Sequence, residues 1–226
     1  MINLLQSVQG TSSDPVTALT PIAWYRFQQG IGTSTVATTT FVSSWQDKSG
    51  NNNHLAQATA TKLPSLQSDS SVLFDGSNDC MQAVYGLNNP FTRYILGKQI
   101  SWNNARLWAS GVSSDTALQQ ATTSPQVRIN DAIGIAFVSP PLDTYVVLMG
   151  MFNGTTSLIR LNLTASSVGT LTGNNAGGLT LSGTSSQLGG FSNIQVKEVI
   201  DFAGAHTTPQ QNSVIVYLGT VGGINL

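Results

Sequence analysis

Residues 193–202, NIQVKEVIDF, carry the clearest strand pattern of the chain. Apolar side chains recur on one face of this stretch, which predicts a β-strand with that face in the core; they are Ile194, Val196, Ile200 and Phe202. Glu198, the only glutamate of the protein, falls on the same face. Burial raises a carboxyl pKa, as a catalytic acid requires, but buried charges are normally paired. We therefore interpret Glu198 as a structural residue whose hydrogen bonds hold the strand in place.

The segment after this strand predicts a short C-terminal helix. Thr207 or Thr208 is a suitable N-cap, and Pro209 suits the first helical turn. An apolar stripe at helical spacing follows, formed by Val214, Tyr217, Leu218 and Val221. We expect Gly219 or Gly222 to end the helix.

Upstream, short strand patterns alternate with turn residues. Residues 144–152, TYVVLMGMF, are apolar at nearly every position, as in a central strand, and the Asn-Gly pair at 153–154 predicts a hairpin. Turn residues recur about every 8–12 positions, which favours a sandwich or barrel over alternating strands and helices. No linker divides the chain, so we predict one all-β domain.

Composition excludes several classes of partner. Only 8% of the 226 residues are charged and the net charge is -1, while 40% are hydrophobic. The chain can therefore build a core, but it has no basic cluster for nucleic acid or an anionic membrane. No apolar run approaches the roughly 20 residues of a membrane helix. The opening MINLLQSVQG lacks the features of a signal peptide, so we expect synthesis in the host cytoplasm.

Four landmarks occur in order: IAWYRFQQGIG at 22–32, SSWQDKSGNNNH at 43–54, LPSLQSDSSVLFDGSNDCM at 63–81 and the segment at 193–219. This series resembles the concanavalin-A-like, laminin-G-like domains of bacteriophage and bacterial surface proteins. The resemblance implies an all-β, two-sheet antiparallel jelly-roll sandwich with a short C-terminal helix. We assign residues 1–20 to an N-terminal arm and residues 21–226 to the single sandwich domain.

The resemblance also implies a structural role for the conspicuous turn residues. In such domains the turn tryptophan packs inward and the aspartate binds backbone amides, which are Trp45 and Asp47 here. We interpret Asp75 and Asp79 in the same way, since Asp and Asn satisfy local N–H groups in turns. A calcium ion at Asp75 and Asp79 stays open as an alternative, because carboxylates bind hard cations. We expect no cofactor.

Relatives of this fold include glycoside hydrolases, which usually need two carboxylates flanking the scissile bond. Sandwich hydrolases carry them in a Glu-x-Asp-x-x-Glu type of run, and this chain has one Glu and nine scattered Asp residues. We therefore expect the chain not to be an enzyme.

The first functional hypothesis is a virion structural protein. A single sandwich with few charged residues and no signal peptide favours a phage head decoration or cement protein, or else a head fibre or tail component, displayed on the virion surface. Capsid or tail proteins are then its partners, and we expect a homo-oligomer. Four apolar residues of the arm, Ile2, Leu4, Leu5 and Val8, would dock onto the sandwich or onto a neighbouring subunit.

The alternative hypothesis is a carbohydrate-binding module or receptor-binding tip that contacts cell-surface glycans. Trp102, beside Asn103 and Asn104, would stack on a sugar, and Arg106 would assist. Against it, Trp102 and Trp108 would instead pack in the core or at a subunit contact, where tryptophan is enriched. We favour this packing role.

Overall fold

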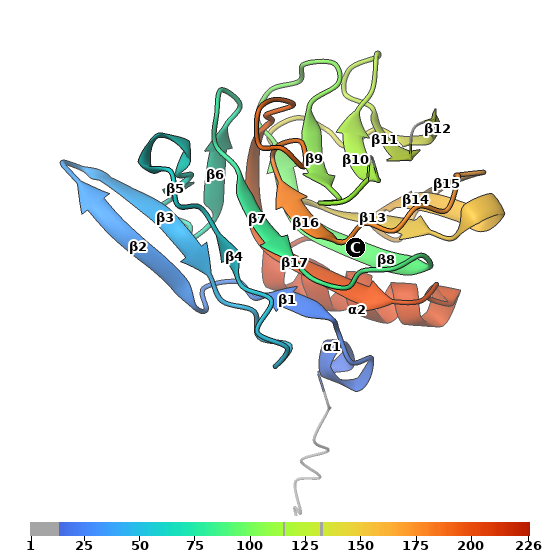
Figure 1. Ribbon diagram of the computed structural model, residues 1–226. Helices are drawn as coiled ribbons and strands as arrows, with labels where there is room; N and C mark the ends of the chain where they lie inside the picture. Colours follow the sequence, from blue (N-terminus) through green and yellow to red (C-terminus); the bar gives the residue numbers. More distant parts are fainter. Residues whose placement is uncertain (1–13, 115, 132) are drawn as a thin grey trace, which may run out of the picture.

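The computed structural model describes residues 14–114, 116–131 and 133–226. It confirms an all-β, antiparallel fold with one long helix near the C-terminus (Figure 1). The strands are β1 (Ala23–Tyr25), β2 (Ile31–Val36), β3 (Thr39–Trp45), β4 (Leu55–Ala56), β5 (Ser65–Leu66), β6 (Val72–Asp75), β7 (Met81–Val84), β8 (Phe91–Gln99), β9 (Leu107–Ser110), β10 (Ala117–Gln120), β11 (Val127–Asp131), β12 (Ile133–Val138), β13 (Val146–Phe152), β14 (Ser157–Leu161), β15 (Ala165–Gly169), β16 (Gly178–Leu181) and β17 (Asn193–Ala203). The helices are α1 (Pro15–Ala18) and α2 (Thr208–Gly222), with short 3-10 turns at Ala60–Lys62 and Gly154–Thr156.

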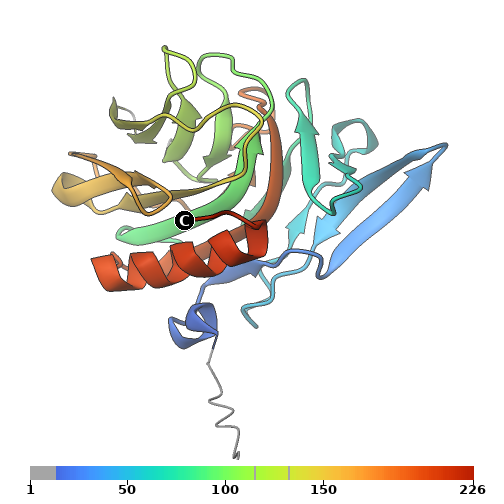
Figure 2. The same ribbon diagram turned by 180° about the vertical axis from the view of Figure 1, so that it is seen from behind.

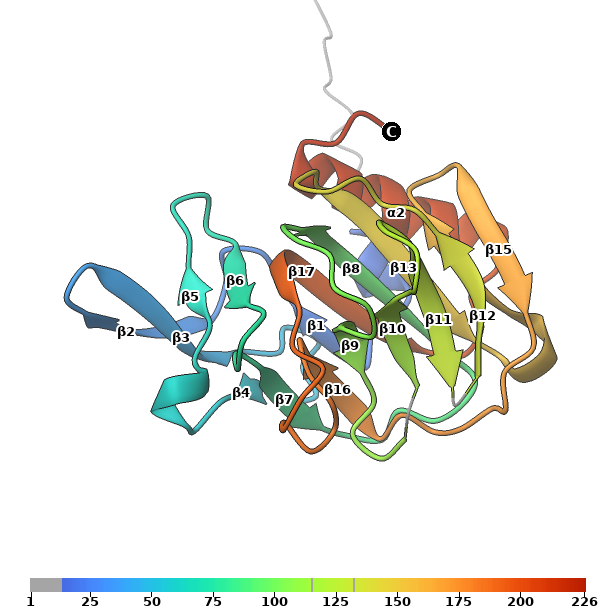
Figure 3. The same ribbon diagram turned by 90° about the horizontal axis from the view of Figure 1, so that it is seen from above.

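The strands form two layers that face each other (Figure 3). In the back layer the strand order is β17, β8, β13, β14, β15. The other edge of β17 pairs with β6 over residues 193–196 and with β1 over residues 199–201. The front layer runs β4, β7, β16, β9, β10, β11, β12. Helix α2 lies along the outer side of the back layer (Figure 2).

The prediction of two separate sheets needs a correction, because all 17 strands belong to one continuous hydrogen-bonded set. Strand β3 pairs with β4 of the front layer and also with β5. Strand β5 in turn pairs with β6 of the back layer. The layers therefore join at the side from which the β2–β3 hairpin extends.

Two apolar clusters form the core, one between the two layers and one between the back layer and α2. The first fills the space between them and includes Trp45, Trp108 and the stacked rings of Phe91 and Phe152, whose centroids lie 4.4 Å apart. The second lies between the back layer and α2, and Val16 of α1 joins it. Residues 14–20 of the predicted arm are thus partly packed on the domain. The arm residues Ile2, Leu4, Leu5 and Val8 lie outside the described residues.

A β-bulge in β17 corrects the predicted faces of this strand. Its register against β8 shifts between Val196 and Glu198, which inserts an extra residue and reverses the alternation of side chains. Ile194 and Val196 therefore face the front layer, whereas Glu198, Ile200 and Phe202 point away from it toward α2. A single strand thus supplies both cores.

Helix α2 and the central strand follow the predicted pattern closely. Thr207 and Gln210 form a capping box at the start of α2, and Pro209 lies in its first turn. The helix ends at Gly222, one of the two predicted positions, and Gly223 is its left-handed C-cap at φ 66°. All seven residues of β13 are buried. No helix in the described ranges is long and apolar enough to cross a membrane.

A buried ion pair lies in the back layer, and its guanidinium also contacts the front layer. Arg93 of β8 donates to both carboxylate oxygens of Asp201 on β17, each at 2.7 Å, and the two residues are 1% and 0% exposed. The same guanidinium reaches the front layer, where it donates to the carbonyls of Ser110 at 3.3 Å and Gly178 at 3.0 Å. Tyr85 donates its hydroxyl to Asp201. Burial raises the pKa of Tyr85 well above its usual value, so it stays a neutral donor.

Replacing Asp201 with Asn should strongly destabilise the protein, because it leaves the buried Arg93 guanidinium without a counter-charge. Breaking such a pair typically costs about 3–5 kcal/mol of unfolding free energy. Urea denaturation of the wild type and the variant measures this loss. The matched control is Asp143→Asn, whose ion pair with Lys98 involves a carboxylate that is 70% exposed; it should lose less than about 1 kcal/mol. Equal losses in the two variants would contradict the assigned role of Asp201.

Candidate functional site

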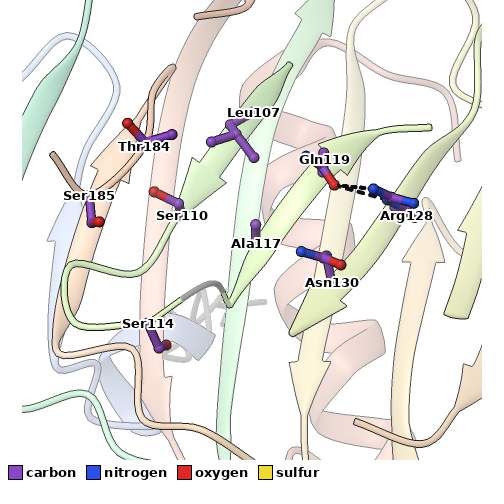
Figure 4. Close-up of a pocket in the computed structure, with 9 residues that line it drawn as sticks. All are labelled: Leu107, Ser110, Ser114, Ala117, Gln119, Arg128, Asn130, Thr184 and Ser185. Carbon is purple, nitrogen blue, oxygen red and sulfur yellow. Dashed lines mark hydrogen bonds between the residues drawn. The ribbon is translucent and has the colours of Figure 1, made fainter. Parts of the chain in front are cut away.

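A hollow opens on the outer face of the front layer, away from the core (Figure 4). Its volume is about 290 Å³, which is at the lower end of the range for small-molecule sites. Strands β9, β10 and β11 form its floor, and the segment after β16 forms one wall. The lining residues are Leu107, Ser110, Ser114, Ala117, Gln119, Arg128, Asn130, Thr184 and Ser185.

Strand alternation places the polar side chains together in this hollow. Val127 and Ile129 of β11 point into the core, so Arg128 and Asn130 between and beyond them point outward. Arg128 lies opposite Gln119 in the pairing of β10 with β11. The pattern VRIN therefore puts a cation and an amide on the open face of the layer.

Arg128 is held by its neighbour on β10. The Gln119 side-chain oxygen accepts hydrogen bonds from Nε and Nη2 of Arg128 at 2.9 Å and 2.6 Å (Figure 4). This two-point contact fixes the plane of the guanidinium, because Arg presents its donors in a rigid fork. The side chain therefore enters the hollow already ordered.

An exposed aromatic ring lies beside this pair. Phe137 of β12 is opposite Arg128 in the pairing of β11 with β12, and it is 42% exposed. A phenylalanine on the open face of a sheet presents an apolar surface next to the polar floor. The arrangement combines a flat apolar contact with fixed hydrogen-bond donors and acceptors.

The floor of the hollow is hydrogen-bonded to Arg93 of the buried ion pair through Ser110. Ser110 lines the hollow, and its carbonyl accepts a hydrogen bond from Arg93 on the opposite side of β9. Its hydroxyl donates to the Gly183 carbonyl at 2.8 Å, next to Thr184 of the wall. Position 110 is thus tied to both the back layer and the wall.

The loop considered as the alternative sugar-binding site lies next to the hollow but does not line it. The backbone N–H of Asn103 donates a hydrogen bond to the side-chain oxygen of Gln120 at 2.8 Å. The side-chain amide of Gln119 donates to the Ala105 carbonyl at 3.3 Å. Asn103 and Asn104 are exposed. Trp102 is partly exposed and belongs to neither apolar cluster, so it does not take the core position, and a subunit contact for it stays a prediction. Trp108 is fully buried and donates to Gln99.

Two side-chain nitrogens of this loop have no hydrogen-bond partner among the described residues. They are Nε1 of Trp102 and Nε of Arg106, and both atoms are buried. Buried polar groups normally have partners. The loop therefore holds donors that its own contacts leave unused.

The turn at residues 45–53 is an internally bonded structure. Trp45 is fully buried and donates its indole N–H to the Arg26 carbonyl at 3.1 Å. Asp47 accepts hydrogen bonds from the backbone N–H groups of Trp24, Ser49 and Asn53 at 2.8–3.0 Å. Its carboxylate thereby ties β1 to the turn.

Asp75 and Asp79 likewise direct their carboxylates to backbone amides. Asp75 accepts from Ser77 at 2.8 Å, and Asp79 accepts from the Asp75 N–H at 3.1 Å. In the part of the chain that the structure describes, no three His, Cys, Asp or Glu side chains form a group able to hold a metal ion. Burial raises the pKa of Asp79 to about 6.

Glu198 is fully buried between the back layer and α2. It accepts hydrogen bonds from the Trp24 indole at 2.6 Å, the Tyr217 hydroxyl at 2.9 Å and the Phe27 N–H at 3.1 Å. Burial raises its pKa, and these three donors oppose that effect. Glu198 thus connects β1, β17 and α2.

Sequence inspection did not single out the residues of the hollow. The signal that was present is the alternation in residues 127–130, where apolar and polar side chains take turns as in a half-buried strand. That Gln119 and Phe137 flank Arg128 depends on strand pairing, which the sequence does not display.

The sequence matches no protein-family model and no curated protein. Its fold is similar to that of solved glycoside hydrolases. A GH54 α-L-arabinofuranosidase soaked with a cyclic sulfate inhibitor has 14% identity and a TM-score of 0.64 over 88% of this chain and 62% of that chain. An arabinofuranosidase complexed with arabinofuranosyl-alpha-1,2-xylobiose has 15% identity, a TM-score of 0.61 and coverage of 88% and 58%.

A third similar structure is the Trypanosoma rangeli sialidase in complex with sialic acid. It has 13% identity and a TM-score of 0.58, and the match covers 84% of this chain and 32% of that chain. The chain thus spans less than two thirds of each of these three proteins. At such identities the similarity shows the fold.

These comparisons contradict the expectation that the chain is not an enzyme. That expectation relied on a missing Glu-x-Asp-x-x-Glu run, yet glycoside hydrolases at 13–15% identity contain this fold. A scaffold can keep its fold while the residues of its site change completely. A sequence run typical of one group of sandwich hydrolases is therefore no criterion for the whole fold.

The raised pKa of Asp79 predicts a pH-dependent effect of Asp79→Asn. The pKa of the Asp79 carboxyl rises from 3.8 to about 6 on folding. Its contribution to the stability of the native state is therefore fully present below pH 3.8 and is lost as the pH rises through about 6. The uncharged Asn variant keeps a side-chain oxygen for the Asp75 N–H and avoids that loss. Its stability relative to wild type should increase from pH 4 to pH 7, by up to about 2 kcal/mol.

Thermal and urea unfolding of both proteins across this pH range measures the difference. Ser77→Ala, which removes an exposed hydroxyl of the same turn and no titratable group, is the control and should follow the wild-type profile. Parallel profiles for Asp79→Asn and wild type would show that Asp79 is not protonated on folding.

Proposed function

We propose that this chain is a carbohydrate-binding protein that holds a saccharide in the hollow of the front layer. The observation that carries the proposal is the meeting of Arg128, Gln119 and the exposed ring of Phe137 on one open face. Sugars present hydroxyl groups around their edge and C–H groups on their faces. The fixed polar pair suits the hydroxyl groups, and the ring suits a C–H face.

The other lining residues support the same ligand class. Ser110, Ser114, Asn130, Thr184 and Ser185 bring hydroxyl and amide groups, which both donate and accept hydrogen bonds. Sugar hydroxyl groups do the same. Binding is therefore the chemistry that these nine residues support.

The neighbouring loop and the fold add further support. Trp102 is partly exposed beside β10 and presents an aromatic surface next to the hollow. The solved structures that share the fold include proteins complexed with arabinofuranosyl-alpha-1,2-xylobiose and with sialic acid. We further propose that the strand arrangement is the jelly roll of the concanavalin-A-like, laminin-G-like domains.

A glycan array followed by calorimetry with the retained sugar tests this function. Arg128→Met and Phe137→Ala should each weaken binding at least tenfold, equivalent to about 1.4 kcal/mol, because Arg and aromatic side chains dominate such contacts. The controls are Lys48→Met and Val84→Ala, which remove an exposed cation and an exposed apolar side chain outside the hollow. They should bind as the wild type does.

Unchanged binding by both Arg128→Met and Phe137→Ala, or no glycan retained by the wild type, would contradict the proposal. Release of reducing sugar from each retained glycan is measured in parallel, since glycoside hydrolases share the fold.

A second proposal is the role of a virion structural protein, most simply a phage head decoration or cement protein or a head fibre or tail component. The observation that favours it is the uncharged β2–β3 hairpin, which extends from the body as a surface suited to assembly (Figure 1). Both roles are compatible, because a protein on a particle surface can also bind cell-surface glycans.

Quantitative mass spectrometry of purified particles tests the virion role. A structural component should be present at a fixed copy number per capsid or tail, independent of the preparation, because its sites on the lattice are fixed in number. A copy number that falls with each purification step would indicate a contaminant and would contradict this role.

A further inference from the structure

We propose that strand β2 pairs with β2 of a second copy of this chain, so that two protomers form a two-fold symmetric dimer through their projecting hairpins. This interface is separate from the hollow and does not depend on the carbohydrate proposal. Three features of the hairpin carry it: an open strand edge, a complete lack of charge and exposed side chains that suit a partner of the same sequence.

The open edge follows from the strand pairing. In the described part of the chain, β2 pairs with β3, from Ile31 opposite Trp45 to Val36 opposite Thr39. Its other edge faces away from the body of the domain (Figure 3). Such an edge presents a row of backbone N–H and C=O groups that is ready to pair with another strand.

The hairpin lacks the features that normally prevent edge pairing. Residues 31–44, IGTSTVATTTFVSS, contain no charged residue and no proline, whereas proteins usually protect edges with lysine, proline or inward-pointing charges. A bulge is present, but it lies between Gly32 and Thr33. It leaves Thr33–Val36 regular, and all four of these residues are exposed.

A second copy is the occupant that these residues fit best. Antiparallel pairing of β2 with itself brings Thr and Ser side chains opposite one another, and such cross-strand pairs are favourable. No like charges meet, because the strand has none, and the whole chain has a net charge of only -1. An interface that uses the same patch on both subunits closes at two.

The shape of the molecule permits this contact. The β2–β3 hairpin extends beyond both layers at one end of the domain, whereas β11 and β12 lie at the other end (Figures 1 and 3). Two protomers can therefore approach through their hairpin edges with the bodies on opposite sides.

Sedimentation equilibrium of the full chain tests the dimer. Ser34 lies in the middle of β2, where the two-fold axis would pass, so the two copies of residue 34 come close. Ser34→Lys should raise the dimer dissociation constant at least tenfold through like-charge repulsion. Mixing Ser34→Lys with Ser34→Glu should restore a dimer, because opposite charges then meet. The control Val84→Lys adds a cation at a 73% exposed strand position outside the hairpin and should dimerise as the wild type does.

Circular dichroism and the thermal midpoint establish that each variant is folded, and Thr35→Lys replaces Ser34→Lys if the latter is not. A wild type that is monomeric at every accessible concentration would overturn the proposal. So would a Ser34→Lys variant that dimerises as tightly as the wild type, or a charge-reversed mixture that stays monomeric. Larger wild-type assemblies that Ser34→Lys leaves intact would also overturn it.

Discussion

The hydrogen bonds of Arg93 are the constraint on which the arrangement of the two layers depends. The side chain starts on β8 of the back layer, pairs with Asp201 on the adjacent strand and ends at two carbonyls of the front layer. A guanidinium in a dry interior is tolerated only when its charge and its donors are matched. The groups that match it belong to β9, β16 and β17. A shift of the front layer would leave some of these groups unpaired, so the ion pair fixes the separation and alignment of the layers at this point.

This constraint reaches the proposed binding site through Ser110. The carbonyl of Ser110 accepts a hydrogen bond from Arg93, and its hydroxyl donates one to the Gly183 carbonyl next to the wall. These two bonds hold the strand in place. Arg128 is held in front by Gln119. Ligand binding to side chains that are already ordered loses less conformational entropy than binding to mobile ones. The hollow is small, and its affinity would come from this ordering more than from area.

Local patterns predicted the elements of this fold, but pairing decided where they combine. Residues 146–152 and helix α2 could be recognised from the sequence, because an apolar run marks a buried strand and an apolar stripe with capping residues marks a helix. The bulge at Val196–Glu198 could not, since nothing in NIQVKEVIDF marks the inserted residue, and the predicted common face of Ile194 and Ile200 was therefore wrong. Arg93 stands within FTRYILG as a lone charge in an apolar strand, and Asp201 stands the same way in VIDF. Neither residue was singled out from the sequence, because only the β8–β17 register makes them partners.

Strand pairing likewise separates the hollow from the loop in residues 99–108, which was the alternative sugar-binding site considered from the sequence. QISWNNARLW is rich in the residue types that bind sugars, so composition drew attention to Trp102 and Arg106. Residues 127–130 are ordinary by composition, and their interest arises because β10 and β12 place Gln119 and Phe137 on either side of Arg128. The β2–β3 hairpin extends beyond one end of the molecule, whereas β9, β10 and β11, which form the floor of the hollow, lie in the front layer away from it (Figure 3). A dimer through β2 would leave both hollows open, and two linked sites bind a surface with many copies of a glycan far more tightly than one. Self-association through the hairpin and glycan recognition at the hollow, as proposed, would therefore reinforce each other on one scaffold.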